Sequence, residues 1–470
     1  MKIVKKALWG MLCFFIFLVV FFASLLARLA GLAGIGMDSF TLQSEAAEAA
    51  RYQGAIQKET IDVPYITNEG SVETRQLVLY RPEDAAGDLP LVYVPHYAVE
   101  ENSADFQAYM TRGWAAASPV FQEQYNGQLT GNDLVFNNAA LCALRNRNGI
   151  DRQRIAVVGG SAGGYMALML SELQMGTCAT IANSPIANIY YNLFIHFPAC
   201  DAVNRDAGFF DLPIPIQLLV SKSFRVNLGN FPDVSDADRW AALSPLGMAK
   251  CFSNPVVVNH YTGDILVPVD QITKRWTYAQ SDGSLPSDFP LRMGSDYPGI
   301  LSRSLEEEAD PNELLVQRFA LVNQHIDMDM PFSDQMLTIN IFDDGPMSAK
   351  GSHTAPGTGG SMDTLPYLEE MFSHTLAETE KATPQKLLLL LKRYLGQSAQ
   401  LPAHEEVDDT VYGSLAVYRR EIAEELAVYA ANHSLQALDV AVAAALENAD
   451  QAAELRSAWE EIKALISPAP

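Results

Sequence analysis

The stretch that decides the fold reads Ile155-Ala156-Val157-Val158-Gly159-Gly160-Ser161-Ala162-Gly163-Gly164. Its first four residues form a continuous apolar run, as expected of a parallel strand that is buried on both faces. The residues that follow, from Tyr165 to Leu173, carry a helical pattern. The glycines between the two segments lack a Cβ, so they allow a sharp turn. The stretch therefore predicts a strand–turn–helix unit with Ser161 at the turn.

Ser161 is the candidate nucleophile. The pattern G-x-S-x-G is weak alone, but it becomes specific when it lies between a buried strand and a helix. Such a turn points the Ser161 hydroxyl into a cleft and places the N–H of Ala162 at the helix N-terminus, where it can stabilise an oxyanion. A glycine-rich turn without a catalytic role is the alternative interpretation.

A nucleophilic serine needs a base and an acid that orients the base, and both follow the serine in this type of chain. Asp264 lies in a turn straight after the predicted strand Pro255–His260 and is the candidate acid. A turn aspartate that only caps local backbone N–H groups is the alternative. Asp270, Asp343 and Asp344 are weaker candidates.

His353 is the candidate base. It follows the last predicted core strand, Met336–Phe342, in a loop that contains glycine. His374 is the main competitor, and a solvated loop histidine without a partner is the alternative for His353. A second oxyanion donor is expected from the loop after the third strand. A backbone N–H of Tyr97 or Ala98, or the Tyr97 hydroxyl, could serve.

Strand and helix patterns alternate along the chain, which predicts an α/β fold with a mostly parallel sheet flanked by helices. The expected strands are Thr74–Tyr80, Leu89–Pro95, Gly113–Pro119, Ile155–Val158, Pro255–His260 and Met336–Phe342, and the expected helices are Asn132–Arg147, Tyr165–Leu173 and Leu387–Leu395.

The chain divides into four expected parts. Residues 1–30 form a signal anchor or signal peptide, and residues 31–59 form a lead-in or stalk. Residues 60–395 form the α/β domain, with inserted caps near 185–242 and 271–335, because loops of that length are rarely structureless. Residues 396–470 form a linker and an acidic helical extension of two antiparallel helices.

The N-terminal segment has three early lysines followed by a nearly unbroken apolar run, Ala7–Ala27. About 20 such residues span a bilayer when helical. Lysines before the span stay in the cytoplasm, so we expect an uncleaved anchor with the α/β domain outside the cytoplasm, periplasmic or extracellular. Secretion after signal cleavage is the alternative.

The formal net charge is −24, which disfavours nucleic acid as a partner because phosphate backbones are bound by clustered Lys and Arg. No zinc motif is present among the five cysteines. Buried free thiols are expected, and Cys200–Cys251 is the first disulfide to consider if the chain is exported.

The segment from Gly149 to Gly164 resembles the serine-turn region of the α/β-hydrolase superfamily, closest to carboxylesterases and prolyl-oligopeptidase-like catalytic domains. Ser244-Pro245-Leu246 and Gly263-Asp264 resemble the same group. The resemblance implies an α/β-hydrolase fold and a Ser161–His353–Asp264 triad. The sequence departs from it at His96-Tyr97-Ala98, where many esterases carry His-Gly-Gly.

We therefore expect a serine hydrolase that cleaves carboxylic esters, of small-molecule or lipid-like type, through an acyl-enzyme and without a cofactor. The first alternative is a serine peptidase of the prolyl-oligopeptidase-like group. Peptidases of this group carry a β-propeller, for which the segment from Leu29 to Glu73 is too short. The second alternative is a non-catalytic binding protein on a hydrolase fold.

Overall fold

The structure is a computed structural model. The predicted membrane segment 1–30, the lead-in up to residue 50 and most of the two expected caps lie outside the described residues. Among the residues that are described, no helix is long and apolar enough to cross a membrane. The described residues are 51–67, 70–120, 129, 131–174, 176–189, 192, 244–245, 251–261, 264, 267, 271, 337–342, 364–380, 386–392, 412, 420–424, 426–427, 430, 434–447, 449 and 451–466.

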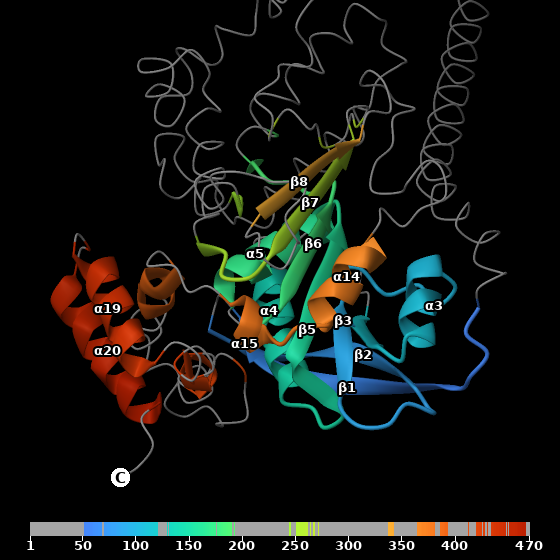
Figure 1. The fold of residues 1–470 in the computed structure, drawn as a ribbon, viewed down its shortest axis with the longest axis horizontal. Helices are drawn as coiled ribbons and strands as arrows, with labels where there is room; N and C mark the ends of the chain where they lie inside the picture. Colours follow the sequence, from blue (N-terminus) through green and yellow to red (C-terminus); the bar gives the residue numbers. More distant parts are fainter. Residues whose placement is uncertain are drawn as a thin grey trace, which may run out of the picture.

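An eight-stranded sheet forms the centre of the molecule (Figure 1). Its order is β1-β2-β4-β3-β5-β6-β7-β8. Strand β2 is antiparallel to both neighbours, and the strands from β4 to β8 are parallel, which confirms the predicted mostly parallel sheet. The strands are β1 (Ile56–Ile66), β2 (Val72–Pro82), β3 (Leu89–Tyr93), β4 (Ala115–Pro119), β5 (Ile150–Gly160), β6 (Ala179–Asn183), β7 (Val256–Tyr261) and β8 (Leu337–Phe342).

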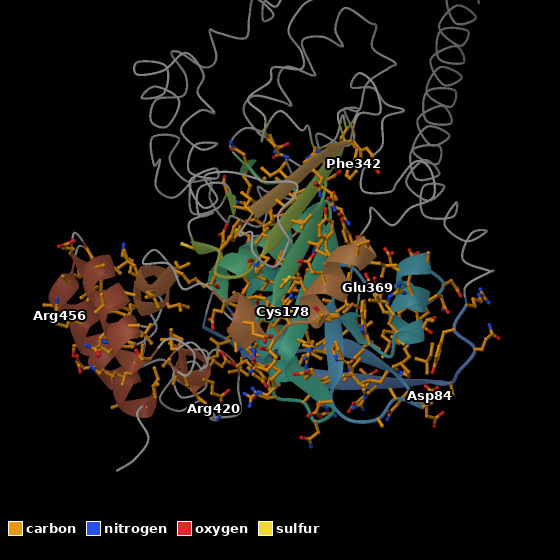
Figure 2. All side chains as sticks on the ribbon, viewed as in Figure 1. Asp84, Cys178, Phe342, Glu369, Arg420 and Arg456 are labelled. Atoms are coloured by element: carbon orange, nitrogen blue, oxygen red, sulfur yellow. The ribbon has the colours of Figure 1, made fainter. Side chains whose placement is uncertain are left out.

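Helices cover both faces of the sheet, and each face has its own apolar cluster. One cluster joins the sheet to α4 (Asn132–Arg145) and α5 (Ala162–Leu173). The other joins it to α3 (Ala104–Thr111) and α14 (Thr364–Phe372), which is followed by α15 (Leu376–Thr379). Figure 2 shows side chains filling these layers, with the buried Cys178 in the interior.

Burial on both faces explains the apolar stretches of the central strands, as β3 shows. Leu91 and Tyr93 of β3 belong to the cluster on the α4 and α5 face, whereas Val92 between them belongs to the α3 and α14 face. All three side chains are fully buried. Because successive side chains of a strand point to opposite faces, a strand covered on both sides needs apolar residues at every position.

Two strands were not predicted, and one is longer than predicted. Strand β1 was not recognised because it is an edge strand with mostly exposed polar residues, and it begins at Ile56, before the expected domain start at residue 60. The first half of β5 carries polar side chains at 151–154, so the apolar run marked only its end. The five-residue strand β6 was also missed.

Two helices were expected in the C-terminal part, and α19 (Leu435–Leu446) and α20 (Ala452–Ile466) are present, drawn in red in Figure 1. Residues 420–424 are helical as well, so the described C-terminal part has more than the two helices expected. Helices α19 and α20 share an apolar cluster with the helix over 386–392. The buried Lys386 Nζ donates to the backbone oxygens of Ser171 (2.7 Å) and Gln174 (2.5 Å) at the end of α5. Unsatisfied carbonyls at a helix C-terminus favour a cation, so Lys386 attaches this cluster to the sheet layer.

Three cysteines are described, and all three are buried free thiols: Cys142, Cys178 and Cys251. Burial raises the pKa of the Cys251 thiol to about 12, so the thiolate does not form at neutral pH. Cys200 lies outside the described residues, so its pairing with Cys251 remains a prediction.

Leu368→Ala tests the packing of α14 on the sheet. Leu368 is fully buried, so its truncation removes apolar burial and leaves a cavity, at a cost of about 2–5 kcal/mol in the free energy of unfolding. The matched control is Leu465→Ala in α20, where the side chain is 57% exposed. This change should stay within about 0.5 kcal/mol in urea unfolding. Equal effects of the two substitutions would show that α14 is not packed as described.

Candidate active site

The Ser161 turn joins the end of β5 to the start of α5. Ser161 has φ 55° and ψ −119°, a backbone conformation that is strained for a residue with a side chain. Its N–H donates to the carbonyl oxygen of Asn183 at 2.9 Å, and its own carbonyl oxygen accepts from the N–H of Tyr165 at 2.9 Å. The Ser161 side chain does not cap α5. The hydroxyl is therefore not occupied by the helix that it precedes.

Two glycines make this turn possible. A Cβ at Gly159 would lie 2.2 Å from the backbone oxygen of Gly163, so the end of β5 and the first turn of α5 are in direct backbone contact. A Cβ at Gly163 would lie 3.1 Å from the backbone oxygen of Pro95 and 3.2 Å from the ring of Tyr97. The second glycine thus lets the loop after β3 lie against the start of α5.

Tyr97 reaches Ser161 from that loop. The Tyr97 ring lies against the first turn of α5, 3.2 Å from where a Cβ on Gly163 would be, and its hydroxyl is near enough to that of Ser161 for the two to interact. The whole residue is 38% exposed, yet desolvation of its hydroxyl raises the pKa of Tyr97 to about 12, and the nearby Ser161 opposes this shift. Tyr97 is therefore a neutral O–H donor throughout the physiological range.

The structure distinguishes between the oxyanion donors considered for this loop. The backbone N–H of Tyr97 donates to the carbonyl oxygen of Pro95 at 2.8 Å, so the hydroxyl is the group of Tyr97 that is directed to Ser161. Ala98 is exposed next to it. Ala162 is the first residue of α5, the position where helical N–H groups lack a partner within the helix.

Asp264 lies beyond the end of β7 and is fully buried. Its Oδ1 accepts from the N–H of Val267 at 3.0 Å, which is the local capping contact considered above. Strand β7 lies two positions from β5 in the sheet, and both strands run in the same direction. Asp264 and Ser161 consequently follow strands that end at the same edge of the sheet, where sites of open α/β sheets lie.

His353 lies outside the described residues, as do Asp270, Asp343 and Asp344. In the chain it follows β8, the strand next to β7. The pairing of His353 with Ser161 and Asp264 therefore remains a prediction.

His374, the competing base, lies at the opposite end of the sheet from Ser161. The Nε of Arg154 donates to the carbonyl oxygen of Phe372 at 2.8 Å, which places the end of α14 beside the first half of β5. The extended chain from Arg154 to Ser161 covers roughly 20 Å at about 3.3 Å per residue. The side chain of His374 is too short to reach Ser161 across that distance.

His260 is buried inside β7, and its Nε2 lies 3.4 Å from Nε2 of Gln271. Gln271 organises the loop after β6: its Oε1 accepts from the N–H groups of Ala187 (3.0 Å) and Asn188 (3.1 Å), and its Nε2 donates to the oxygen of Pro185 (2.8 Å). His260 thus faces the start of the first expected cap.

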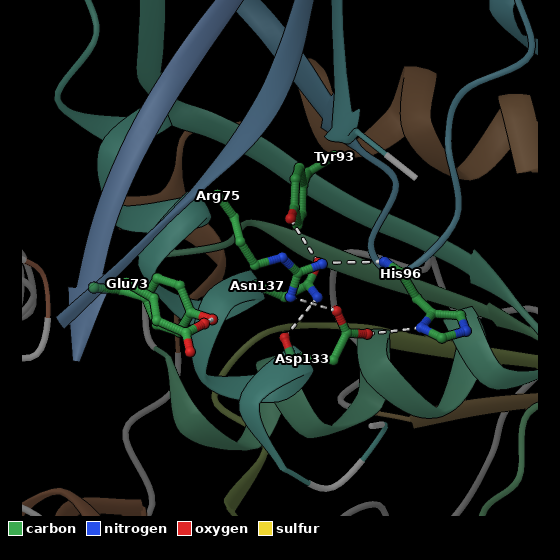
Figure 3. A network of polar contacts seen from close by, with 7 residues as sticks. Glu73, Arg75, Tyr93, His96, Asp133 and Asn137 are labelled. Carbon is green, nitrogen blue, oxygen red and sulfur yellow. Dashed lines mark hydrogen bonds and ion pairs between the residues drawn. The ribbon is translucent and has the colours of Figure 1, made fainter. Parts of the chain in front are cut away.

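A buried polar network contacts the Tyr97 loop at His96 and was not predicted from the sequence (Figure 3). Asp133 of α4 accepts from Arg75 of β2 through Oδ1 at 3.0 Å and contacts His96 Nδ1 through Oδ2 at 2.7 Å. The side chains of all three residues are at most 4% exposed.

Asn137, one helical turn after Asp133, adds to the same network. Its Oδ1 accepts from the Tyr93 hydroxyl at 2.7 Å and from the backbone N–H of His96 at 3.2 Å. Its Nδ2 donates to the backbone oxygen of Asp133 at 2.7 Å. The available sequence signal was that Asp133 and Asn137 share a helical stripe with the apolar Phe136, since residues three and four apart lie on one face.

Among the described residues, no group of His, Cys, Asp and Glu side chains is arranged to hold a metal ion.

Gly159→Ala tests the backbone contact at the turn. The new Cβ would overlap the Gly163 carbonyl, which cannot move without shifting α5, so we expect a loss of about 1–3 kcal/mol or more in the free energy of unfolding. Gly164→Ala is the milder comparison at the same turn, because its Cβ would lie 3.1 Å from Pro185 and 3.2 Å from the backbone oxygen of Gly159, against 2.2 Å for the Cβ of Gly159→Ala. Urea unfolding of both variants measures the difference, and a neutral Gly159→Ala would contradict the described contact.

Tyr97 should not ionise near pH 10. A raised pKa keeps the phenol neutral until the pH approaches about 12. The phenolate absorbance of the wild type minus that of Tyr97→Phe should therefore show no ionising tyrosine between about pH 9 and 11. An extra tyrosine that titrates near pH 10 would show that the Tyr97 hydroxyl is not in its described place.

The comparisons with known proteins agree with this architecture. Residues 108–194, from α3 to the loop after β6, match the model of the prolyl oligopeptidase family. No curated protein shows significant similarity to the chain. Similar solved structures include a puromycin hydrolase (18% identity, TM-score 0.34), which covers 46% of this chain and 32% of its own.

Two further structures illustrate the range of the match. The acylaminoacyl peptidase of Pyrococcus horikoshii is 14% identical with a TM-score of 0.40, over 70% of this chain and 43% of its own. A thermophilic carboxylesterase from a metagenomic library is 17% identical with a TM-score of 0.38, over 65% of this chain and 85% of its own. The chain thus spans less than half the length of the puromycin hydrolase and of the acylaminoacyl peptidase.

The fold assignment rests on the sheet order, with β2 antiparallel and the serine turn directly after β5, which is the arrangement of the α/β-hydrolase fold. The chain therefore has an α/β-hydrolase fold, and the part of it that holds the serine turn matches the prolyl oligopeptidase family model.

Proposed function

We propose that the protein cleaves carboxylic esters through an acyl-enzyme on Ser161. The observation that carries the proposal is Ser161, held on a strained turn at the N-terminus of α5, with Tyr97 packed against the same turn. A nucleophilic serine needs oxyanion donors beside it, and the N–H of Ala162 and the hydroxyl of Tyr97 could supply them. Strained backbone of this kind also clusters at functional sites.

In the proposed reaction, His353 accepts the proton of Ser161 while Oγ bonds to the ester carbonyl carbon. The carbonyl electron pair moves onto oxygen, and the N–H of Ala162 and the O–H of Tyr97 stabilise that oxyanion. Collapse of the intermediate releases the alcohol, which takes its proton from His353. Water then repeats the sequence on the acyl group and frees Ser161.

Asp264 is proposed to orient His353. A buried carboxylate beyond the end of a parallel strand can hold the imidazole in one tautomer and stabilise its cationic form. The burial of Asp264 and its position at the same sheet edge as Ser161 support this role. The contact with Val267 occupies Oδ1, so Oδ2 is the atom we propose for His353.

The ester preference rests on the resemblance of the serine turn to carboxylesterases, and small-molecule or lipid-like esters are the proposed substrates. The match of residues 108–194 to the prolyl oligopeptidase family favours a second candidate, hydrolysis of peptide or aminoacyl amide bonds. Both reactions use the same Ser161 chemistry and differ in the leaving group that His353 protonates.

We also propose that residues 1–30 anchor the protein in a membrane, with the hydrolase domain on the non-cytoplasmic side. The apolar run Ala7–Ala27 after Lys2, Lys5 and Lys6 supports this proposal.

Fluorophosphonate labelling tests the nucleophile and the base together. Wild type should be labelled on Ser161, whereas Ser161→Ala and His353→Ala should lower labelling and kcat by about 10³-fold or more, because triad members act as a unit. His374→Ala is the matched control, since His374 lies at the far end of β5, and it should react like wild type. Loss of labelling in His374→Ala with normal labelling in His353→Ala would reverse the assignment.

Comparing the hydrolysis of p-nitrophenyl esters with that of aminoacyl arylamides by the unlabelled wild type separates the two candidate functions, and the fluorophosphonate-labelled wild type serves as the inactive blank in both assays. We expect ester turnover to exceed amide turnover in kcat/KM. Rapid cleavage of the amides with inert esters would replace the ester proposal by the peptidase candidate.

A further inference from the structure

His96 occupies a backbone position that suits glycine, yet it carries a large buried side chain. Its φ is 70°, in the left-handed region where a side chain costs free energy. The residue is only 5% exposed. A histidine at such a position must be compensated by what its imidazole contacts.

The imidazole lies between the polar network and Tyr97. Nδ1 is 2.7 Å from Oδ2 of Asp133, and the ring packs edge-to-face against the Tyr97 ring at 4.4 Å between centroids. The Tyr97 ring in turn lies against Gly163, two residues after Ser161, which places its hydroxyl near that of Ser161. A continuous series of contacts therefore runs through Arg75, Asp133, His96, Tyr97 and Ser161.

The network leaves the imidazole little freedom. A carboxylate only accepts hydrogen bonds, so Nδ1 carries the proton toward Asp133. The other oxygen of Asp133 is taken by Arg75, and the backbone N–H of His96 is taken by Asn137. The buried Nε2 has no hydrogen-bond partner among the described residues. The ring is thus held by Asp133 on one side and packs against the Tyr97 ring in an edge-to-face arrangement on the other.

We propose that His96 is a positioning residue, whose Asp133-anchored imidazole holds the Tyr97 hydroxyl at the point where the oxyanion forms beside Ser161. The inference rests on the proposed function. The proposal predicts an effect on the rate at which bound substrate reacts. An oxyanion donor stabilises the transition state and not the bound substrate, so misplacing the donor lowers kcat and leaves KM nearly unchanged.

The first experiment compares His96→Gly with His96→Asn. Glycine removes the imidazole without backbone strain, whereas asparagine tolerates positive φ and keeps an N–H donor for Asp133. Removing an oxyanion donor typically costs about 10²- to 10³-fold in kcat, so we expect His96→Gly to lose at least about tenfold on p-nitrophenyl esters. His96→Asn should recover part of that loss. Asp133→Asn is unsuitable because it leaves the buried Arg75 charge without its partner.

The second experiment is a double-mutant cycle with Tyr97→Phe. If His96 acts through the Tyr97 hydroxyl, His96→Gly has no further effect on kcat once that hydroxyl is absent. A general loss of folding would instead reduce both backgrounds by the same factor. Equal factors in the two backgrounds would overturn the proposal.

A titration of the Tyr97 hydroxyl tests the proposal without a measurement of catalytic activity. In the His96→Gly background, the phenolate difference between the protein with Tyr97 and the Tyr97→Phe variant should reveal a tyrosine that ionises near pH 10, because the released hydroxyl returns to water. If Tyr97 still ionises only near pH 12, the imidazole does not position it and the inference fails. A wild type that is not labelled by fluorophosphonate overturns the proposed function, and this titration then decides the positioning role by itself.

Discussion

At the end of β5 the chain reverses into α5 with no side chain between them, so the backbone of Gly159 touches the backbone of Gly163. This contact sets the direction in which α5 leaves the sheet, and α5 then packs on β5 and β6 with an almost wholly buried surface. It also determines the left-handed conformation of Ser161. The central layer of the molecule and the orientation of its proposed nucleophile therefore depend on the same close approach.

The second half of the site is brought by a loop that is distant in the sequence. The loop after β3 lies closely against α5 at Gly163, where a Cβ would be 3.1 Å from the backbone oxygen of Pro95, and this approach brings Tyr97 near Ser161. Strain is present on both sides, since His96 and Ser161 both have positive φ. The sheet, α4 and the buried Asp133 network hold these conformations in place, as strained residues require.

The central parallel strands and their helices were predictable because burial on both faces leaves continuous apolar runs, as in Ile155–Val158. The edge strand β1 was not, since one of its faces meets water and its polar residues hide the strand pattern. The Asp133–His96 contact was also hidden, because it joins a helix to a loop 37 positions away.

By itself, the sequence determined the turn at Ser161, because a buried strand, four glycines and a helix within one short stretch permit few other conformations. It also placed Asp264 after a strand of the same sheet. Only the tertiary structure decided that His374 lies at the wrong end of β5 and that Tyr97 faces Ser161 through its hydroxyl. Local backbone conformation depends on neighbouring residues in the sequence, whereas the distances of His374 and Tyr97 from Ser161 depend on how strands and helices pack together.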